Sequence, residues 1–210
     1  MRVLVVEREG GSGSRAVAQL EDHGHEVVRC DDAHAESGLP CAGLPGGSGC
    51  PLDAEPIDVV VAVRGDAGGP STDAETGIRC ALRQRVPVMV LGSAEGASYA
   101  DMVDEVAEMD SPALDDRVVA LGRAGLAATA SVAEDAVDPL LAGHGIDRSA
   151  IDVSVTRTKA RLRVHVQVDA PLDAKMRQAC AVAAVGALRD HQPSIEGLDV
   201  EVTGTESLTD

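Results

Sequence analysis

Three continuous apolar runs constrain the fold of this chain more than any other feature. Residues 2–7, 57–63 and 86–91 are short and rich in Val. A short run that stays apolar at consecutive positions predicts a strand buried on both faces, as in a parallel sheet. Helical patterns at 14–23 and 73–84 separate the runs and supply the crossovers that parallel strands require. The alternation therefore predicts an α/β domain.

The rest of this first region continues the alternation. His25–Cys30 predicts a second strand, and 98–109 predicts a helix after the last apolar run, so no clear fifth strand is expected. Residues 31–56 are rich in Gly and Pro, which predicts a long loop. Loops of that length are usually functional or disordered.

The pattern changes after Gly145. Ile151–Thr156 and Leu162–Val168 alternate polar and apolar side chains with period two, which predicts a hairpin with one buried face. We expect a long helix at 172–190 and a closing strand at 198–202. These elements predict a small α+β unit of ββαβ order, with one helix on an antiparallel sheet.

The two patterns divide the chain into three predicted parts. Between them, 113–124 and 131–143 fit helices. We therefore expect an α/β domain at 1–109, a helical connector at 110–148 and a ββαβ domain at 149–205.

Composition excludes several classes of function. The chain has no Phe, no Trp and one Tyr, and its formal net charge is −17. Proteins that bind nucleic acids use Lys and Arg for the phosphates and aromatic side chains for single-stranded bases, so direct nucleic-acid binding is not expected. The N-terminal apolar stretch is too short for a signal peptide, and no run approaches the ~20 residues of a membrane helix. We expect a cytoplasmic protein without membrane contact.

Cysteine residues are the first candidate ligands. Five cysteines, an odd number, argue against a disulfide framework in that compartment. The predicted topology allows Cys30, Cys41, Cys50 and Cys80 to approach one face of the sheet. Four thiolates would suit Zn²⁺ or an iron–sulfur cluster. The alternative is that Cys30 and Cys80 are small core residues, as free cysteines often are.

A glycine motif follows the first predicted strand. Gly11, Gly13 and Ala16 fit the pattern G-x-G-x-x-A before a helix, which indicates a dinucleotide-binding turn. Glu7 and Glu9 would repel a phosphate there, however. The alternative interpretation is a flexible Gly-Ser loop.

Basic side chains gather around the predicted hairpin turn. They are Arg157, Lys159, Arg161 and Arg163. Such a cluster in an acidic chain predicts a docking surface for a partner's carboxylates or for a phosphate. The alternative is a solvated sheet face paired with nearby Asp and Glu.

Two resemblances to known families rest on local motifs. Through Val3-Leu-Val-Val-Glu7 and Leu20-Glu-Asp-His-Gly-His-Glu-Val27, residues 1–109 resemble the receiver domain of two-component response regulators. Residues 150–204 are similar to the small domain of alkaline-shock (envelope-stress) proteins, through the hairpin, a long helix from Pro171 and Glu196-Gly-Leu-Asp-Val-Glu-Val202. The resemblances imply a flavodoxin- or receiver-like, mostly parallel sheet followed by a small α+β domain.

The receiver resemblance does not extend to the phosphorylation site. A receiver has an Asp at the end of its third strand, a hydroxyl after the fourth and a Lys after the fifth. Here Arg64 replaces the Asp and Ser93 fits the hydroxyl position, while the only lysines, Lys159 and Lys175, follow the first domain. An acyl phosphate needs a carboxylate, a metal and a cationic partner together.

The sequence therefore predicts a non-catalytic regulatory or interaction protein on a degenerate receiver-like scaffold, without phosphorelay activity. A protein partner is expected, and a homo-oligomer is one form it could take. Two alternatives from other classes stay open. The first is a metal- or iron–sulfur-binding protein that uses the cysteine loop, and the second is a nucleotide-binding enzyme.

Overall fold

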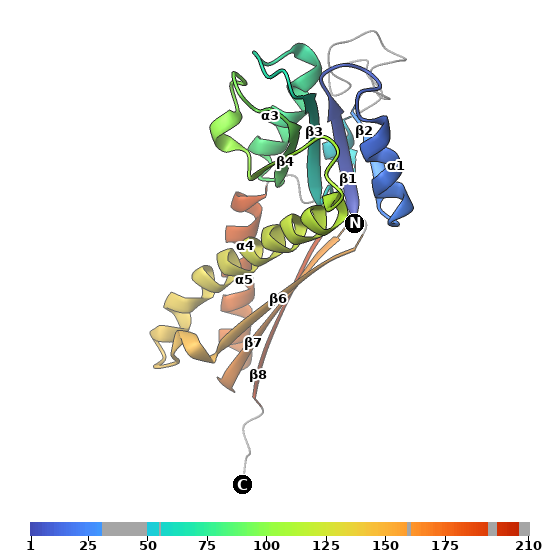
Figure 1. Cartoon of the computed structure of the whole chain (residues 1–210). Helices are drawn as coiled ribbons and strands as arrows, with labels where there is room; N and C mark the ends of the chain where they lie inside the picture. Colours follow the sequence, from blue (N-terminus) through green and yellow to red (C-terminus); the bar gives the residue numbers. More distant parts are fainter. Residues whose placement is uncertain (31–49, 55, 159–160, 193–196, 206–210) are drawn as a thin grey trace. The chain divides into compact units, whose positions relative to one another are not determined.

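A computed structural model describes residues 1–30, 50–54, 56–158, 161–192 and 197–205. The chain divides into two compact units, Met1–Gly125 and Leu126–Asp210 (Figure 1). Within the described residues, no helix is both long enough and apolar enough to cross a bilayer.

The first unit contains a five-stranded, all-parallel sheet of order β2-β1-β3-β4-β5. This confirms the predicted α/β fold, and the order is that of flavodoxin- and receiver-like domains. The strands are β1 (Arg2–Glu7), β2 (Glu26–Arg29), β3 (Val59–Gly65), β4 (Val88–Gly92) and β5 (Glu105–Ala107).

The apolar runs form the centre of this sheet because helices cover both of its faces. Alternate residues of β1 point to opposite sides, so that Val3 and Val5 enter one core while Leu4 and Val6 enter the other. Helix α1 (Ser14–Asp22) contributes to the first core. The short helix α2 (Pro51–Ala54) and helix α3 (Thr76–Arg83), which follows the 3₁₀ turn η1 (Asp73–Glu75), contribute to the second.

Two predictions for residues 98–109 are wrong. The segment does not form a helix, and it contains a fifth strand. A single 3₁₀ turn, η2 (Ala100–Met102), leads directly into β5. Tyr99 is 1% exposed and fixes the chain to the core just before η2. Asp104 then bonds to Val88 twice, through its backbone N–H at 3.0 Å and through its carboxylate, which accepts from the Val88 N–H at 2.8 Å. These bonds start the ladder to β4, so the chain extends instead of coiling.

Helix α4 (Leu114–Ala142) is one continuous helix of 29 residues where two were expected. Residues 124–130 hold four alanines, and alanine has the highest helix propensity, so no break separates the halves. Leu114 and Val118 belong to a core of the first unit, whereas Val137 and Leu141 belong to the core of the second. The segment expected as a connector therefore supplies core residues to both units.

The second unit contains a three-stranded sheet of order β6-β7-β8. Its strands are β6 (Ile151–Thr158), β7 (Arg161–Pro171) and β8 (Gly197–Thr205). The predicted hairpin is confirmed by the antiparallel pairing of β6 and β7. The sheet is mixed rather than antiparallel, however. Helix α5 (Ala174–His191) carries the chain back to the end of the sheet at which β7 begins, so β8 pairs parallel to β7.

One face of this sheet is apolar and the other is polar, as the period-two pattern predicts. Leu162, Val164 and Val166 of β7 are at most 2% exposed and pack with Cys180 and Leu188 of α5. The intervening residues of β7 point to the opposite face. Within the described residues, the core of the second unit therefore lies beneath one face of its sheet.

Candidate functional site

The carboxyl edge of the parallel sheet is the first candidate site. Open α/β sheets bind ligands there, at the point where neighbouring strands continue to opposite faces. In this order that point lies between β1 and β3. Arg8 follows β1 and Arg64 lies near the end of β3, so two cations stand at this edge.

Arg64 has a fully buried side chain. Its Nε lies 2.8 Å from Oε1 of Glu75 in an ion pair. Its Nη2 donates to the carbonyl oxygen of Gly69 at 2.6 Å, and the guanidinium carbon lies 5.6 Å from the centroid of the Tyr99 ring. The cation is therefore held on several sides by this chain's own groups.

Glu75 is the centre of this arrangement, which we call the Arg64–Glu75–Tyr99 network. The Tyr99 hydroxyl donates to Oε1 of Glu75, and the Thr72 N–H donates to Oε2 at 2.7 Å. Glu75 and Thr72 also form a capping box at the start of η1. The carboxylate is 2% exposed and has partners on both oxygens.

The pKa of Tyr99 is raised above its ordinary value near 10. Burial is the largest cause, followed by the hydrogen bond to Glu75 and the negative charge of that carboxylate. The positive charges of Arg64 and Arg8 lower the pKa of Tyr99, but by less. The hydroxyl is therefore a stable donor rather than a group that ionises near neutral pH.

The glycine motif encloses a carboxylate. Gly11 has a φ of +84°, which favours glycine, and its N–H donates to Oε2 of Glu7. A Cβ on Gly13 would lie 2.8 Å from Oε1 of Glu7, and Arg29 Nη1 lies 3.5 Å from that oxygen. Ala16 is buried in the core. A phosphate placed in this turn would meet the charge of Glu7.

Of the four candidate cysteines, Cys41 lies outside the described residues. Cys30 is 7% exposed and packs against α3, where a Cβ on Gly77 would lie 2.9 Å from its Sγ. Cys50 and Cys80 pack against the same core. Among the described residues, no three His, Cys, Asp or Glu side chains are placed to hold a metal. The four-cysteine site stays a prediction.

The basic cluster is divided between the two faces of the second sheet. Arg161 and Arg163 lie on its open face. Arg157 instead pairs in register with the buried Leu162, and its Nη2 donates to Gln192 Oε1 at 3.4 Å. Lys159 lies outside the described residues. Among the described members of the cluster, Arg157 therefore lies on the opposite face from Arg161 and Arg163.

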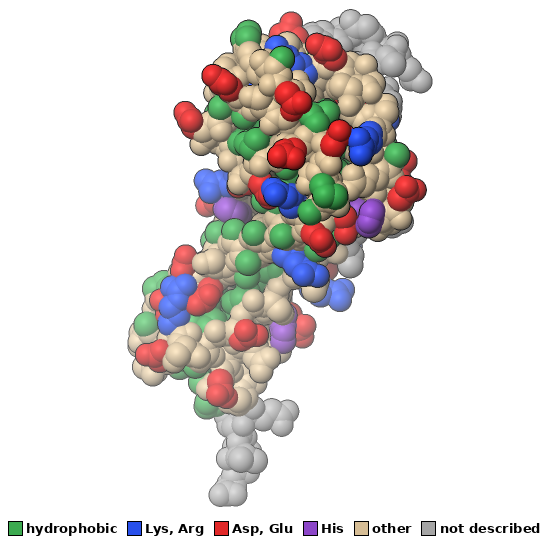
Figure 2. All heavy atoms as spheres, in the orientation of Figure 1, with side chains coloured by type: hydrophobic (Ala, Val, Ile, Leu, Met, Phe, Trp, Pro, Cys, Tyr) green, Lys and Arg blue, Asp and Glu red, His purple; other side chains and the backbone are tan. Residues whose placement is uncertain are grey.

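The open-face arginines have acidic neighbours on β8. Arg161 Nη1 lies 3.4 Å from Oδ2 of Asp199, and Arg163 is in register with the same residue. Figure 2 shows Asp and Glu side chains spread over the visible face of the molecule, as the net charge of −17 requires.

Sequence reasoning missed Glu75 and Tyr99 as site residues. Thr72-x-x-Glu75 has the capping-box spacing, which marks the start of η1 but not the partner of Arg64. Tyr99 is the only aromatic residue of the chain, and that is the signal that could have placed it in the core. Comparison with protein-family models, curated protein sequences and solved structures gives no match.

Proposed function

We propose that the protein is a non-catalytic regulatory or interaction protein whose receiver-like unit takes no part in phosphorelay. The observation that carries the proposal is the buried Arg64–Glu75–Tyr99 network. It puts a paired cation at the acceptor position, where phosphoryl transfer would need a free carboxylate. The first unit also contains no lysine that could neutralise a phosphoryl group.

The energetics of the network favour one fixed arrangement of this edge. Removing one partner of a buried ion pair costs about 3–5 kcal/mol, because the remaining charge stays buried and uncompensated. A phosphorylation switch needs two arrangements that differ by only a few kcal/mol. A unit held in one arrangement suits a different task, which is to present a constant surface to a partner.

The β5 edge supports a protein partner. β5 ends the sheet order, so one side of its backbone has no neighbouring strand within the described sheet. Val106 of this strand is 49% exposed, and Met102, just before the strand, is 56% exposed. Apolar side chains beside an open strand edge are typical of a protein contact.

Phosphotransfer is tested directly. The purified full chain is incubated with acetyl phosphate and Mg²⁺, beside an active receiver domain as positive control, and intact masses are measured. We expect the control to gain a phosphoryl group and this chain to gain none. A stoichiometric, hydroxylamine-labile phosphoryl adduct on this chain would contradict the proposal.

The interaction surface is tested by sedimentation velocity over a range of concentrations. If the partner is a second copy, wild type self-associates and Val106→Lys remains monomeric, with Val182→Lys as a matched control because Val182 is 65% exposed on α5. A wild-type monomer at all concentrations would exclude the homo-oligomer. Self-association that Val106→Lys leaves unchanged would exclude the β5 edge.

A further inference from the structure

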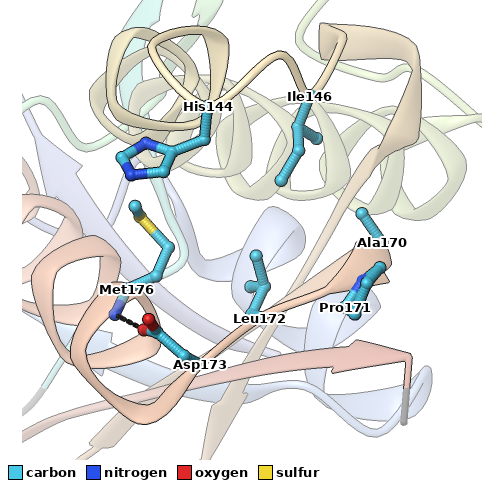
Figure 3. A pocket seen from close by; sticks show the side chains of 7 residues that line it. All are labelled: His144, Ile146, Ala170, Pro171, Leu172, Asp173 and Met176. Carbon is cyan, nitrogen blue, oxygen red and sulfur yellow. Dashed lines mark hydrogen bonds between the residues drawn. The ribbon is translucent and has the colours of Figure 1, made fainter. Parts of the chain in front are cut away.

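The second unit contains a pocket of about 580 Å³ that the proposed function does not use. Figure 3 shows it between the turn that follows α4, the end of β7 and the beginning of α5. Sites for small organic ligands usually enclose about 300–1,000 Å³, and they combine apolar walls with a few polar groups. This pocket has both the volume and that composition.

The apolar walls rest on the core of the unit. Ile146, Leu172 and Met176 line the pocket, and each also packs against the core beneath the sheet. A Cβ on Gly204 of β8 would lie 2.9 Å from Leu172 Cγ, so Leu172 sits directly against the β8 backbone. Contacts within the second unit therefore anchor the pocket walls.

Asp173 gives the pocket a carboxylate with spare acceptor capacity. It is the N-cap of α5, and its Oδ1 accepts from the Met176 N–H at 2.7 Å. The other carboxylate oxygen makes no hydrogen bond within the described part of the chain. Asp173 lines the pocket, so this oxygen is available to a ligand.

His144 supplies a second acceptor. Its Nδ1 lies 3.1 Å from the carbonyl oxygen of Leu140, which can only accept, so Nδ1 carries the hydrogen. The tautomer with its hydrogen on Nδ1 leaves Nε2 as the ring nitrogen that can accept a hydrogen bond. In Figure 3 the Met176 side chain points toward the His144 ring, which places the imidazole beside an apolar wall.

We infer that this pocket binds a small organic amine, with an aliphatic body against the apolar walls and an ammonium group at Asp173. The described lining offers two acceptors and no Lys or Arg. An ammonium is a donor only, and its hydrogen bond to a carboxylate is stronger than one between neutral groups. An anionic head would face Asp173, and the described lining supplies no cation to offset the repulsion. The inference does not depend on the role of the first unit.

Isothermal titration calorimetry on the full chain at neutral pH tests the head group. The probes are cyclohexylmethylamine, cyclohexylmethanol and cyclohexanecarboxylate, which share a ring and differ in charge. We expect saturable binding of the amine, binding at least about tenfold weaker for the alcohol, and none for the carboxylate. No saturable heat with the amine, or tighter binding of the carboxylate, would overturn the inference.

Variants locate the binding. Asp173→Asn keeps an effective N-cap but removes the charge, so the amine should bind at least about tenfold more weakly. Asp190→Asn, an exposed residue at the other end of α5, should leave the affinity unchanged. Ala170→Leu adds volume at the pocket wall and should abolish binding. Amine binding that Asp173→Asn does not weaken would place the head group elsewhere and refute the assignment.

A measurement on the wild-type chain guards against variants that fail to fold. Methionine methyl groups are labelled with ¹³C, and Met176→Leu assigns the Met176 signal. The amine should shift that signal in a saturable way, while exposed Met102 of the first unit stays unchanged. Saturable binding without a shift at Met176 would place the ligand outside this pocket.

Discussion

The carboxyl edge of the parallel sheet and the pocket of the second unit both contain carboxylates beside apolar walls, yet they differ in how those carboxylates are used. Glu7 and Glu75 are each 2% exposed and are held by groups of their own unit. Asp173 uses one oxygen for its helix cap. A charged residue near a predicted ligand position is therefore weak evidence of a site until its hydrogen bonds have been accounted for.

The largest effect should follow from breaking the network in the first unit. Glu75→Ala leaves the Arg64 guanidinium buried without its carboxylate, so we expect a loss of about 3–5 kcal/mol in the free energy of unfolding. Asp73→Ala, exposed on the same turn, should change it by less than about 0.5 kcal/mol. Urea unfolding followed by near-UV circular dichroism suits this test, because Tyr99 is the only aromatic residue and reports the first unit. Equal effects of the two substitutions would refute a structural role for the pair.

Tyr99→Phe tests a single donor of the network. Glu75 keeps Arg64 and Thr72 but loses the Tyr99 hydroxyl, and a hydrogen bond to a charged group contributes about 1.5–3 kcal/mol. Far-UV circular dichroism during urea unfolding measures this loss, since the variant lacks the tyrosine signal. An unchanged unfolding midpoint would show that the hydroxyl contributes nothing.

Alkaline pH should reveal the same hydrogen bond in wild type. The pKa of Tyr99 is raised in the folded state by burial and by Glu75, so above about pH 10 the unfolded chain loses its proton first. This contribution to stability is complete below that pH and falls as the pH rises. Tyrosinate absorbance should therefore appear together with unfolding, and Tyr99→Phe should show a shallower decline of stability above pH 10. Ionisation of Tyr99 near pH 10 in the folded chain would contradict this.

The sequence predicts the sheet of the first unit better than the contacts at its edge. The Val-rich runs of β1, β3 and β4 are buried on both faces, so burial shows directly in their composition. β5 has three residues, too few for any periodicity, and it depends on the bonds between Asp104 and Val88. The pairing of Arg64 with Glu75 likewise arises only when the chain has folded. No local pattern encodes which carboxylate a buried cation will meet.

Gly13→Ala tests how tightly the glycine turn encloses Glu7. The φ of Gly13 is −93°, so alanine suits the backbone, but its Cβ would lie 2.8 Å from Glu7 Oε1. We expect a loss of about 1–3 kcal/mol in the free energy of unfolding, as for other overpacked positions. Gly10→Ala, where no atom lies within 4 Å of the added Cβ, should cost far less in the same urea experiment. Similar costs at both positions would mean that the Glu7 side chain shifts away from the added Cβ.

The smallest effect should come from the open face of the second sheet. An arginine and a carboxylate also pair there, but both side chains are exposed to water. Arg161 and Asp199 lie 3.4 Å apart, with side chains 66% and 48% exposed. Solvent weakens such a pair, and exposed ion pairs contribute about 0–1 kcal/mol, which salt reduces further. A double-mutant cycle of Arg161→Ala and Asp199→Ala should therefore give a coupling below about 1 kcal/mol that declines in 1 M NaCl. A coupling well above about 1 kcal/mol, or one that salt leaves intact, would mean that this face is shielded from water. Deleting Glu75 is costly because it leaves a buried charge uncompensated, whereas Arg161 stays in water when Asp199 is removed.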